Sequence, residues 1–395
     1  MMTTVTASVV RPADRDPVSA AVAQAPVPWY LYPILASSAA IVVGLIWDIS
    51  WHRSIGRDTF WSPPHVLEQI AAIVTGLVCG YVVLRTTLAG TAAERAHSVR
   101  FWGFRGPLGA WVCIWATLMM ITSAPFDDWW HNAYGLDVKI ISPPHMVLAA
   151  GLLGIQLGAM LLTAAAQNRA TDERTKRRLG YLYAIAAGIL LAMAATLVME
   201  EGSLSNQMRG SPFYRWTAAV FPLVLVAAAR GSGLRWSATI AALVYMGIQL
   251  AMIWILQLFP ATPMLAPIYN PVTNFVPPPF PLLVIVPAVA IDILIRRWKW
   301  NEWLLVPVIG ALFVTLRVAA HWYWSAFLLS PSARNYLFSA DRWGYDMRVG
   351  PWRHQYWTLQ TGVTLLKGLG WAAAAATVSA AIGLAIGRGM ARVRR

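Results

Sequence analysis

Residues 29–50 read WYLYPILASSAAIVVGLIWDIS, and this stretch decides the class of fold. It contains a single charged residue, Asp48, and it is as long as the run of about 20 apolar residues that a membrane-spanning helix needs. Similar stretches recur along the whole chain, so the sequence predicts an all-α polytopic integral membrane protein. We expect about ten spans, with approximate bounds 29–50, 64–86, 107–127, 144–167, 180–200, 214–230, 236–258, 279–296, 302–328 and 360–387.

The composition supports this class. Of the 395 residues, 58% are hydrophobic and 12% are charged, whereas soluble domains have about 25% charged residues. A soluble enzyme, a coiled coil and a disordered chain are therefore excluded. The formal net charge is +14, but the basic residues lie between apolar stretches and form no stripe beside exposed aromatic residues. We therefore expect the chain to contact a lipid bilayer and no nucleic acid.

The basic residues also predict an orientation. Lys and Arg gather in alternate connections, on the side of the N-terminus, and residues 169–178 hold the clearest run. By the positive-inside rule this side faces the cytoplasm, so we expect both termini there. Residues 1–27 are polar and rich in Ala and Pro, which predicts a disordered cytoplasmic tail. Most acidic, His and Trp residues of the connections lie on the other side, which we expect to be the periplasmic face of a bacterial inner membrane.

The first outer connection occurs twice. Residues 48–65 read DISWHRSIGRDTFWSPPH, and residues 127–145 read DDWWHNAYGLDVKIISPPH. With one inserted residue, both follow D-x-x-W-H-x-x-x-G-x-D and then S-P-P-H, so they predict two copies of one helical hairpin. We expect a duplicated four-helix metal-binding unit at 28–167. A six-helix unit follows at 168–395, and its long outer loop at 329–358 is a candidate lid.

The spacing of the repeat brings potential ligands together. Asp48 and His52 are four residues apart, so they project from one face of a helix at its outer end. Ser62 is a suitable N-cap, and the two prolines after it fit a first helical turn. His65 then lies in the first turn of the next helix and points back toward the connection. The second copy repeats this set with Asp127, His131 and His145.

One carboxylate and two imidazoles form a three-ligand set with an open position, which is typical of catalytic metal sites. Imidazole suits copper, zinc, iron or nickel. Asp58, Asp137 and Glu68 are candidates for a supporting role around the ligands. Two alternatives remain at this point. The histidines could be interfacial residues beside Trp and Tyr, or they could serve as axial ligands of a haem between the helices.

The two motifs resemble a known pair. The C subunit of the particulate methane and ammonia monooxygenases carries Asp-x3-His-x12-His and Asn-x3-His-x13-His as copper motifs on membrane helices. This chain has Asp48-x3-His52-x12-His65 and then Asp127-x3-His131-x13-His145. The resemblance covers about residues 29–167. It departs from the family pattern at Asp127, where the family has Asn.

The resemblance implies copper, one or two ions, with the six Asp and His residues as ligands; zinc and iron remain alternatives. It also implies oxidation of a small apolar substrate by O₂, with electrons from a quinol or a protein donor and with other membrane subunits as partners. The alternative function is a non-catalytic protein that binds, transfers or assembles copper at the periplasmic face. A haem-binding membrane redox protein is a further alternative.

One pair of residues stands out in the second unit. Arg317 and His321 are four residues apart within the expected span 302–328. Because charge inside a membrane is costly, we expect Arg317 to pair with a carboxylate inside the protein. Alternatively, His321 or His354 could reach the metal site.

Overall fold

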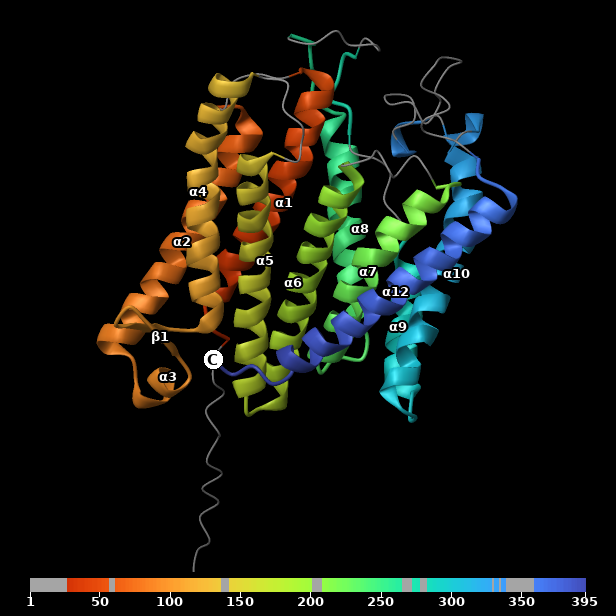
Figure 1. Cartoon of the computed structure of the whole chain (residues 1–395). Helices are drawn as coiled ribbons and strands as arrows, with labels where there is room; N and C mark the ends of the chain where they lie inside the picture. Colours follow the sequence, from red (N-terminus) through yellow and green to blue (C-terminus); the bar gives the residue numbers. More distant parts are fainter. Residues whose placement is uncertain are drawn as a thin grey trace, which may run out of the picture.

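The fold is that of an all-α polytopic membrane protein (Figure 1). The computed structural model describes residues 27–56, 61–135, 142–200, 208–264, 272–277, 283–328, 330–333, 335–338 and 359–395. Among them, nine helices are long and apolar enough to cross a membrane. These are α1 (Leu31–Ser54), α2 (Pro63–Ala89), α4 (Leu108–Tyr134), α5 (Pro143–Arg169), α6 (Glu173–Glu200), α7 (Ser211–Gly231), α8 (Ser237–Leu256), α10 (Glu302–Leu328) and α12 (Gly362–Met390).

Shorter elements join the long helices. They are α3 (Ala92–Ala96), the two-stranded antiparallel hairpin of β1 (Val99–Phe101) and β2 (Phe104–Gly106), α9 (Ile285–Arg297), and the 3₁₀ turns η2 (Pro331–Ala333) and η3 (Tyr336–Phe338). The β-hairpin was not expected from the sequence. Trp102 and Gly103 between its strands both have positive φ, as a tight two-residue hairpin turn requires.

The expected spans are confirmed, with one correction. The eighth of the ten expected spans, 279–296, contains only α9 within the described residues. Its 13 residues make a helix of about 20 Å, shorter than the roughly 30 Å apolar thickness of a bilayer. The sequence suggests why, because Pro277, Pro278, Pro279 and Pro281 precede it and proline disfavours a helix interior.

The helices form a bundle in which the first half packs as two hairpins. α1 packs on α2, and α4 packs on α5, while α2 and α4 join the two hairpins. Small residues allow the close approach of α4 and α5: a Cβ on Gly158 would lie 2.4 Å from Cys113 Sγ. The Thr117 hydroxyl of α4 donates to the Ala72 carbonyl of α2 over 3.0 Å. These contacts fix the two hairpins side by side.

The helices of the second half pack against the first half through α5 and α6. α6 packs on α5 and α8, α12 packs on α7 and α10, and α9 packs on α7, α8 and α10. α1 begins and α12 ends at the same end of the bundle (Figure 1). We call the other end, where α1 ends and α2 begins, the triad end. The expected tail, residues 1–27, lies outside the described residues except for residue 27, as does most of the expected loop 329–358.

Candidate metal centre

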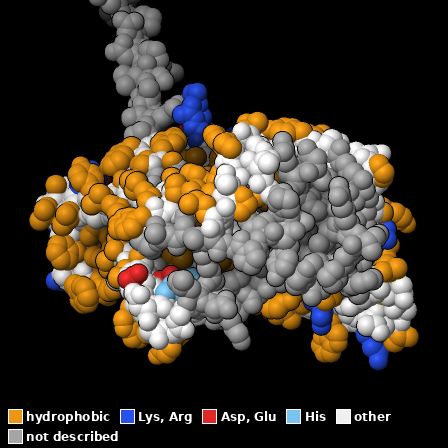
Figure 2. All heavy atoms as spheres, turned by 90° about the horizontal axis from the view of Figure 1, so that it is seen from above, with side chains coloured by type: hydrophobic (Ala, Val, Ile, Leu, Met, Phe, Trp, Pro, Cys, Tyr) orange, Lys and Arg blue, Asp and Glu red, His pale blue; other side chains and the backbone are white. Residues whose placement is uncertain are grey.

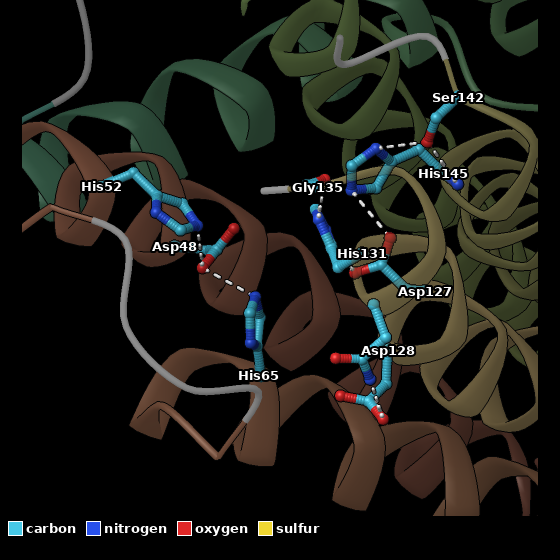
Figure 3. Close-up of polar contacts among 10 residues, drawn as sticks. Asp48, His52, His65, Asp127, Asp128, His131, Gly135, Ser142 and His145 are labelled. Carbon is cyan, nitrogen blue, oxygen red and sulfur yellow. Dashed lines mark hydrogen bonds and ion pairs between the residues drawn. The ribbon is translucent and has the colours of Figure 1, made fainter. Parts of the chain in front are cut away.

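The first hairpin brings its three predicted ligands together at the triad end (Figure 3). The Asp48 Oδ1 atom lies 3.5 Å from His52 Nε2 and 3.0 Å from His65 Nε2. Asp48 and His52 are on the last turns of α1, and His65 is on the first turn of α2, as the sequence predicts. All three donor atoms lie within 4.8 Å of one another. We call these residues the first triad.

This geometry fits a metal ion. For ligands about 2.0–2.1 Å from a tetrahedral metal, donor atoms are separated by about 3.4 Å. The two separations from Asp48 bracket that value. Asp48 Oδ1 is buried, and among the described residues its polar contacts are the two imidazole nitrogens. A buried carboxylate oxygen is costly unless a proton or a cation compensates it. A cation between Asp48 Oδ1 and the two imidazoles would compensate that oxygen.

The second hairpin forms a looser set. Asp127 uses a different oxygen for each histidine: Oδ2 lies 3.3 Å from His131 Nε2, and Oδ1 lies 3.6 Å from His145 Nε2. Within the described residues, the first triad is the one group of three whose donor atoms all lie within 4.8 Å. Asp127, His131 and His145, the second triad, are therefore adjacent but more widely spaced.

Hydrogen bonds fix the ring of His131. Its Nδ1 atom lies 3.3 Å from the Gly135 carbonyl oxygen, which can only accept, so Nδ1 carries the proton. In the neutral ring, Nε2 then offers a lone pair to Asp127 Oδ2. Two acceptors at 3.3 Å repel each other unless a proton or a metal ion lies between them. The second triad therefore also has the chemistry of a cation site.

The repeated glycines have a structural role. Gly56 and Gly135 follow the ends of α1 and α4 with φ values of 99° and 92°, a region that disfavours side chains. The Gly135 N–H donates to the His131 carbonyl over 2.9 Å. Each glycine lies four residues after a predicted ligand, His52 or His131, and just beyond the end of its helix.

The two N-caps differ, although the sequence predicts the same role for both. Ser142 accepts from the His145 backbone N–H at 3.5 Å, and its hydroxyl lies 2.9 Å from His145 Nδ1. Ser62 has the extended backbone of an N-cap but makes no side-chain cap bond, and its Oγ is buried without a partner. The caps thus hold His145 more directly than His65.

Glu68 lies beneath the first triad. Its side chain is only 3% exposed, and its Oε1 atom has no hydrogen-bond partner. Asp48 and His65 both act electrostatically on it. Gly44, one turn before Asp48 on α1, makes room for it, because a Cβ there would lie 2.6 Å from Glu68 Cγ. The sequence singled out Glu68, but it gave no signal for Gly44.

A segment of the second half covers α1 beside the first triad, which the sequence did not indicate. The Ser50 hydroxyl donates to the Val276 carbonyl over 2.5 Å, and the Val276 N–H donates to Ser54 Oγ over 2.7 Å. The Trp51 and Phe275 rings are 5.7 Å apart. We call residues 272–277 the latch segment. Ser50 and Ser54 are four residues apart on α1, and this spacing is the sequence feature that could have indicated the contact.

Acidic and His side chains are visible together at this end of the molecule, with hydrophobic side chains on one side of them (Figure 2). His52 is the most exposed residue of the first triad, with 38% of its side chain accessible, against 16% for Asp48.

The other predicted residues, Asp58, Asp137 and His354, lie outside the described residues. His321 is buried on α10 among other partners, described below.

Comparison of the chain with family models, with curated proteins and with solved structures gives no match. The resemblance of the two hairpins to a monooxygenase subunit therefore rests on their residue spacing. The structure adds a membrane bundle with an Asp/His/His cluster that could hold a metal ion.

Proposed function

We propose that this chain is a membrane copper protein that oxidises a small apolar molecule with O₂. The observation that carries the proposal is the first triad, whose three donor atoms, including a buried carboxylate oxygen, lie within 4.8 Å of one another. Copper is favoured because imidazole nitrogen suits it and because the motif spacing resembles that of copper sites. Asp127, His131 and His145 would hold a second ion.

Bound copper would supply a redox-active centre for reaction with O₂. Overall, one oxygen atom enters a C–H bond and the other leaves as water, and a quinol or protein donor outside this chain supplies two electrons and two protons. Asp48 lowers the net charge of the site. The protonated Nδ1 of His131 leaves Nε2 available as a ligand. Glu68 Oε1 is a buried acceptor that can hold a proton beside Asp48.

The first experiment measures metal content and copper EPR on the detergent-purified chain. We expect copper in the wild-type protein and its loss in His52→Ala and His65→Ala, because each removes one of three ligands. His97→Ala is the matched control, since His97 is exposed beyond α3. His131→Ala reports on the second triad. A folded protein that binds no copper, or binds it equally in all variants, would overturn the proposal; zinc or iron in its place would correct the metal.

Copper binding or transfer without catalysis is the second candidate, favoured by the 38% exposure of His52. The two functions differ in a turnover assay. Oxidation of small alkanes with a quinol donor, lost in His52→Ala, would support the oxidase. Rapid release of copper to an apo-acceptor without any oxidation would support transfer.

A further inference from the structure

Arg317 is a fully buried cation in the second half of the bundle. It lies near the middle of α10, with an exposed fraction of 0%. The rings of Phe213, Phe221 and Phe313 lie 5.1, 5.2 and 5.8 Å from its guanidinium carbon. Aromatic faces attract a cation, but they do not accept hydrogen bonds along its edges. A guanidinium stays charged at neutral pH, so its burial calls for an anionic partner.

The neighbouring His321 is not that partner. Its Nε2 atom accepts from the Leu283 backbone N–H over 2.9 Å, so the proton of the ring is on Nδ1. Nδ1 in turn donates to the Arg317 carbonyl oxygen over 3.1 Å. His321 is therefore a neutral imidazole, and it offers one acceptor to Arg317 Nη1 at 3.4 Å.

Two other donors of Arg317 remain unpartnered. Nε and Nη2 are both buried and make no hydrogen bond. They lie on the same edge of the planar guanidinium, the edge that binds both oxygens of a carboxylate in a fork. The expected carboxylate partner from this chain is not found among the described side chains of the second half. The described acidic side chains of this half contact groups other than Arg317. They are Asp172, Glu173, Asp292 and Glu302.

The N-terminus of α9 adds positive electrostatic potential near Arg317, on the side of His321. Leu283, which His321 accepts from, lies two residues before the start of α9 at Ile285. The first N–H groups of a helix have no partner within it and favour an anion. α9 is about 20 Å long, and its other end lies beside the start of α10 at the end opposite the triads (Figure 1). Its N-terminus therefore lies within the length of the bundle, an arrangement that resembles the half-helices of transporters.

We propose that the unpartnered edge of Arg317 binds the carboxylate of a ligand where α7, α9 and α10 meet. The two oxygens accept from Nε and Nη2, the N-terminus of α9 adds to the attraction, and the three phenylalanines favour an apolar body next to the carboxylate. A small aromatic acid from water and a fatty acid from the bilayer share this chemistry. The proposal is independent of the metal sites.

Equilibrium binding of isotope-labelled benzoate and of labelled oleate to the purified, delipidated chain tests this site. We expect saturable binding of at least one probe near one equivalent per chain, weakened at least tenfold in Arg317→Lys, which keeps the charge and loses the fork. Arg296→Lys is the matched control, because Arg296 also stacks on an aromatic ring, that of Trp236 at 4.3 Å. Binding should be unchanged in that variant.

The probe that binds identifies the source of the carboxylate. Infrared spectra of ¹³C-carboxylate probes on the wild-type chain give a second measurement that needs no variant, since a forked guanidinium contact shifts the carboxylate stretch. Saturable binding of neither probe to the wild-type protein, or equal binding to Arg317→Lys, would overturn the proposal. An unchanged circular-dichroism spectrum and thermal unfolding curve of the variant would show that the chain is still folded.

Discussion

Gly44 allows a carboxylate to lie directly beneath the first triad. Glu68 is packed against it, and an added Cβ would come within 2.6 Å of Glu68 Cγ. That separation is shorter than real Cβ contacts, so the acid would have to move. A residue without a side chain thus controls the position of the Glu68 carboxyl group below Asp48.

Replacing Gly44 with alanine should therefore be costly. We expect Gly44→Ala to lower the free energy of unfolding by about 1–3 kcal/mol, as overpacking does, and to reduce bound metal. Gly80→Ala on α2 is the control, because nothing lies within 4 Å of its added Cβ. Detergent-based unfolding curves and metal analysis of both variants would check this. Equal stability of the two would mean that Glu68 moves aside freely.

The residues of the first triad could be placed from sequence because their relations are local. Asp48 and His52 are one helical turn apart, and His65 begins the next helix of the same hairpin. Arg317 lies on α10, inside the expected span 302–328. Its expected carboxylate partner is not found among the described residues, and the side chains of Glu200, Glu201, Asp341 and Asp346 lie outside the described part of the chain, so that pairing stays a prediction. The spacing of four residues indicated its neighbour His321, but it gave no signal for the rings of Phe213 and Phe221, which come from a different helix.

The caps of α2 and α5 begin two copies of one motif, yet they work differently. Only Ser142 bonds the first turn and the ring of its histidine, whereas Ser62 Oγ is buried without a partner. The repeat thus preserves the residue but not the contact.

This difference predicts opposite outcomes for one substitution. Ser142→Ala should lower the free energy of unfolding by about 0.5–2 kcal/mol, because it removes a cap, and should loosen His145. Ser62→Ala should be neutral or slightly stabilising, because it removes a buried hydroxyl that bonds nothing. Thermal unfolding of the two variants side by side measures the contrast. Matching losses would indicate that Ser62 also caps its helix in solution.

At the scale of elements, the sequence predicts the long helices well. The expected span 302–328 matches α10 to the residue. α4 extends to Tyr134, past the expected end at 127, because a hydropathy window stops at the charged residues while the helix continues through them. Leu283, two residues before the described start of α9, is held by a contact that the sequence does not predict, because its N–H donates to His321, 38 residues away. Such a long-range bond has no local signature.

At the end of the bundle opposite the triads, one carboxylate forms ion pairs that join three helices. Glu302, the first residue of α10, contacts Arg230 near the end of α7 and Arg388 near the end of α12. All three side chains are about one-third exposed. One acid therefore joins three helices whose residues are far apart in the chain.

Removing this charge should loosen the second half modestly. We expect Glu302→Gln to lower the free energy of unfolding by about 1 kcal/mol, since exposed ion pairs contribute little. The loss should shrink at about 1 M salt, where charges are screened. Glu173→Gln is the control, because that side chain is 90% exposed. Unfolding at two salt concentrations tests this, and a loss of metal in Glu302→Gln would contradict the separation of the two ends.

The bond between Ser50 and the latch segment has a consequence for biosynthesis. The serine and Val276 are 226 residues apart, and a ribosome adds about 5–20 residues per second. The hairpin that carries the first triad is therefore made about 10 to 50 seconds before the segment that fastens onto it. In that interval the three ligands are already present on a nascent chain while their neighbour from the second half is still untranslated. A metal ion supplied during translation would therefore meet the first triad in its least covered state.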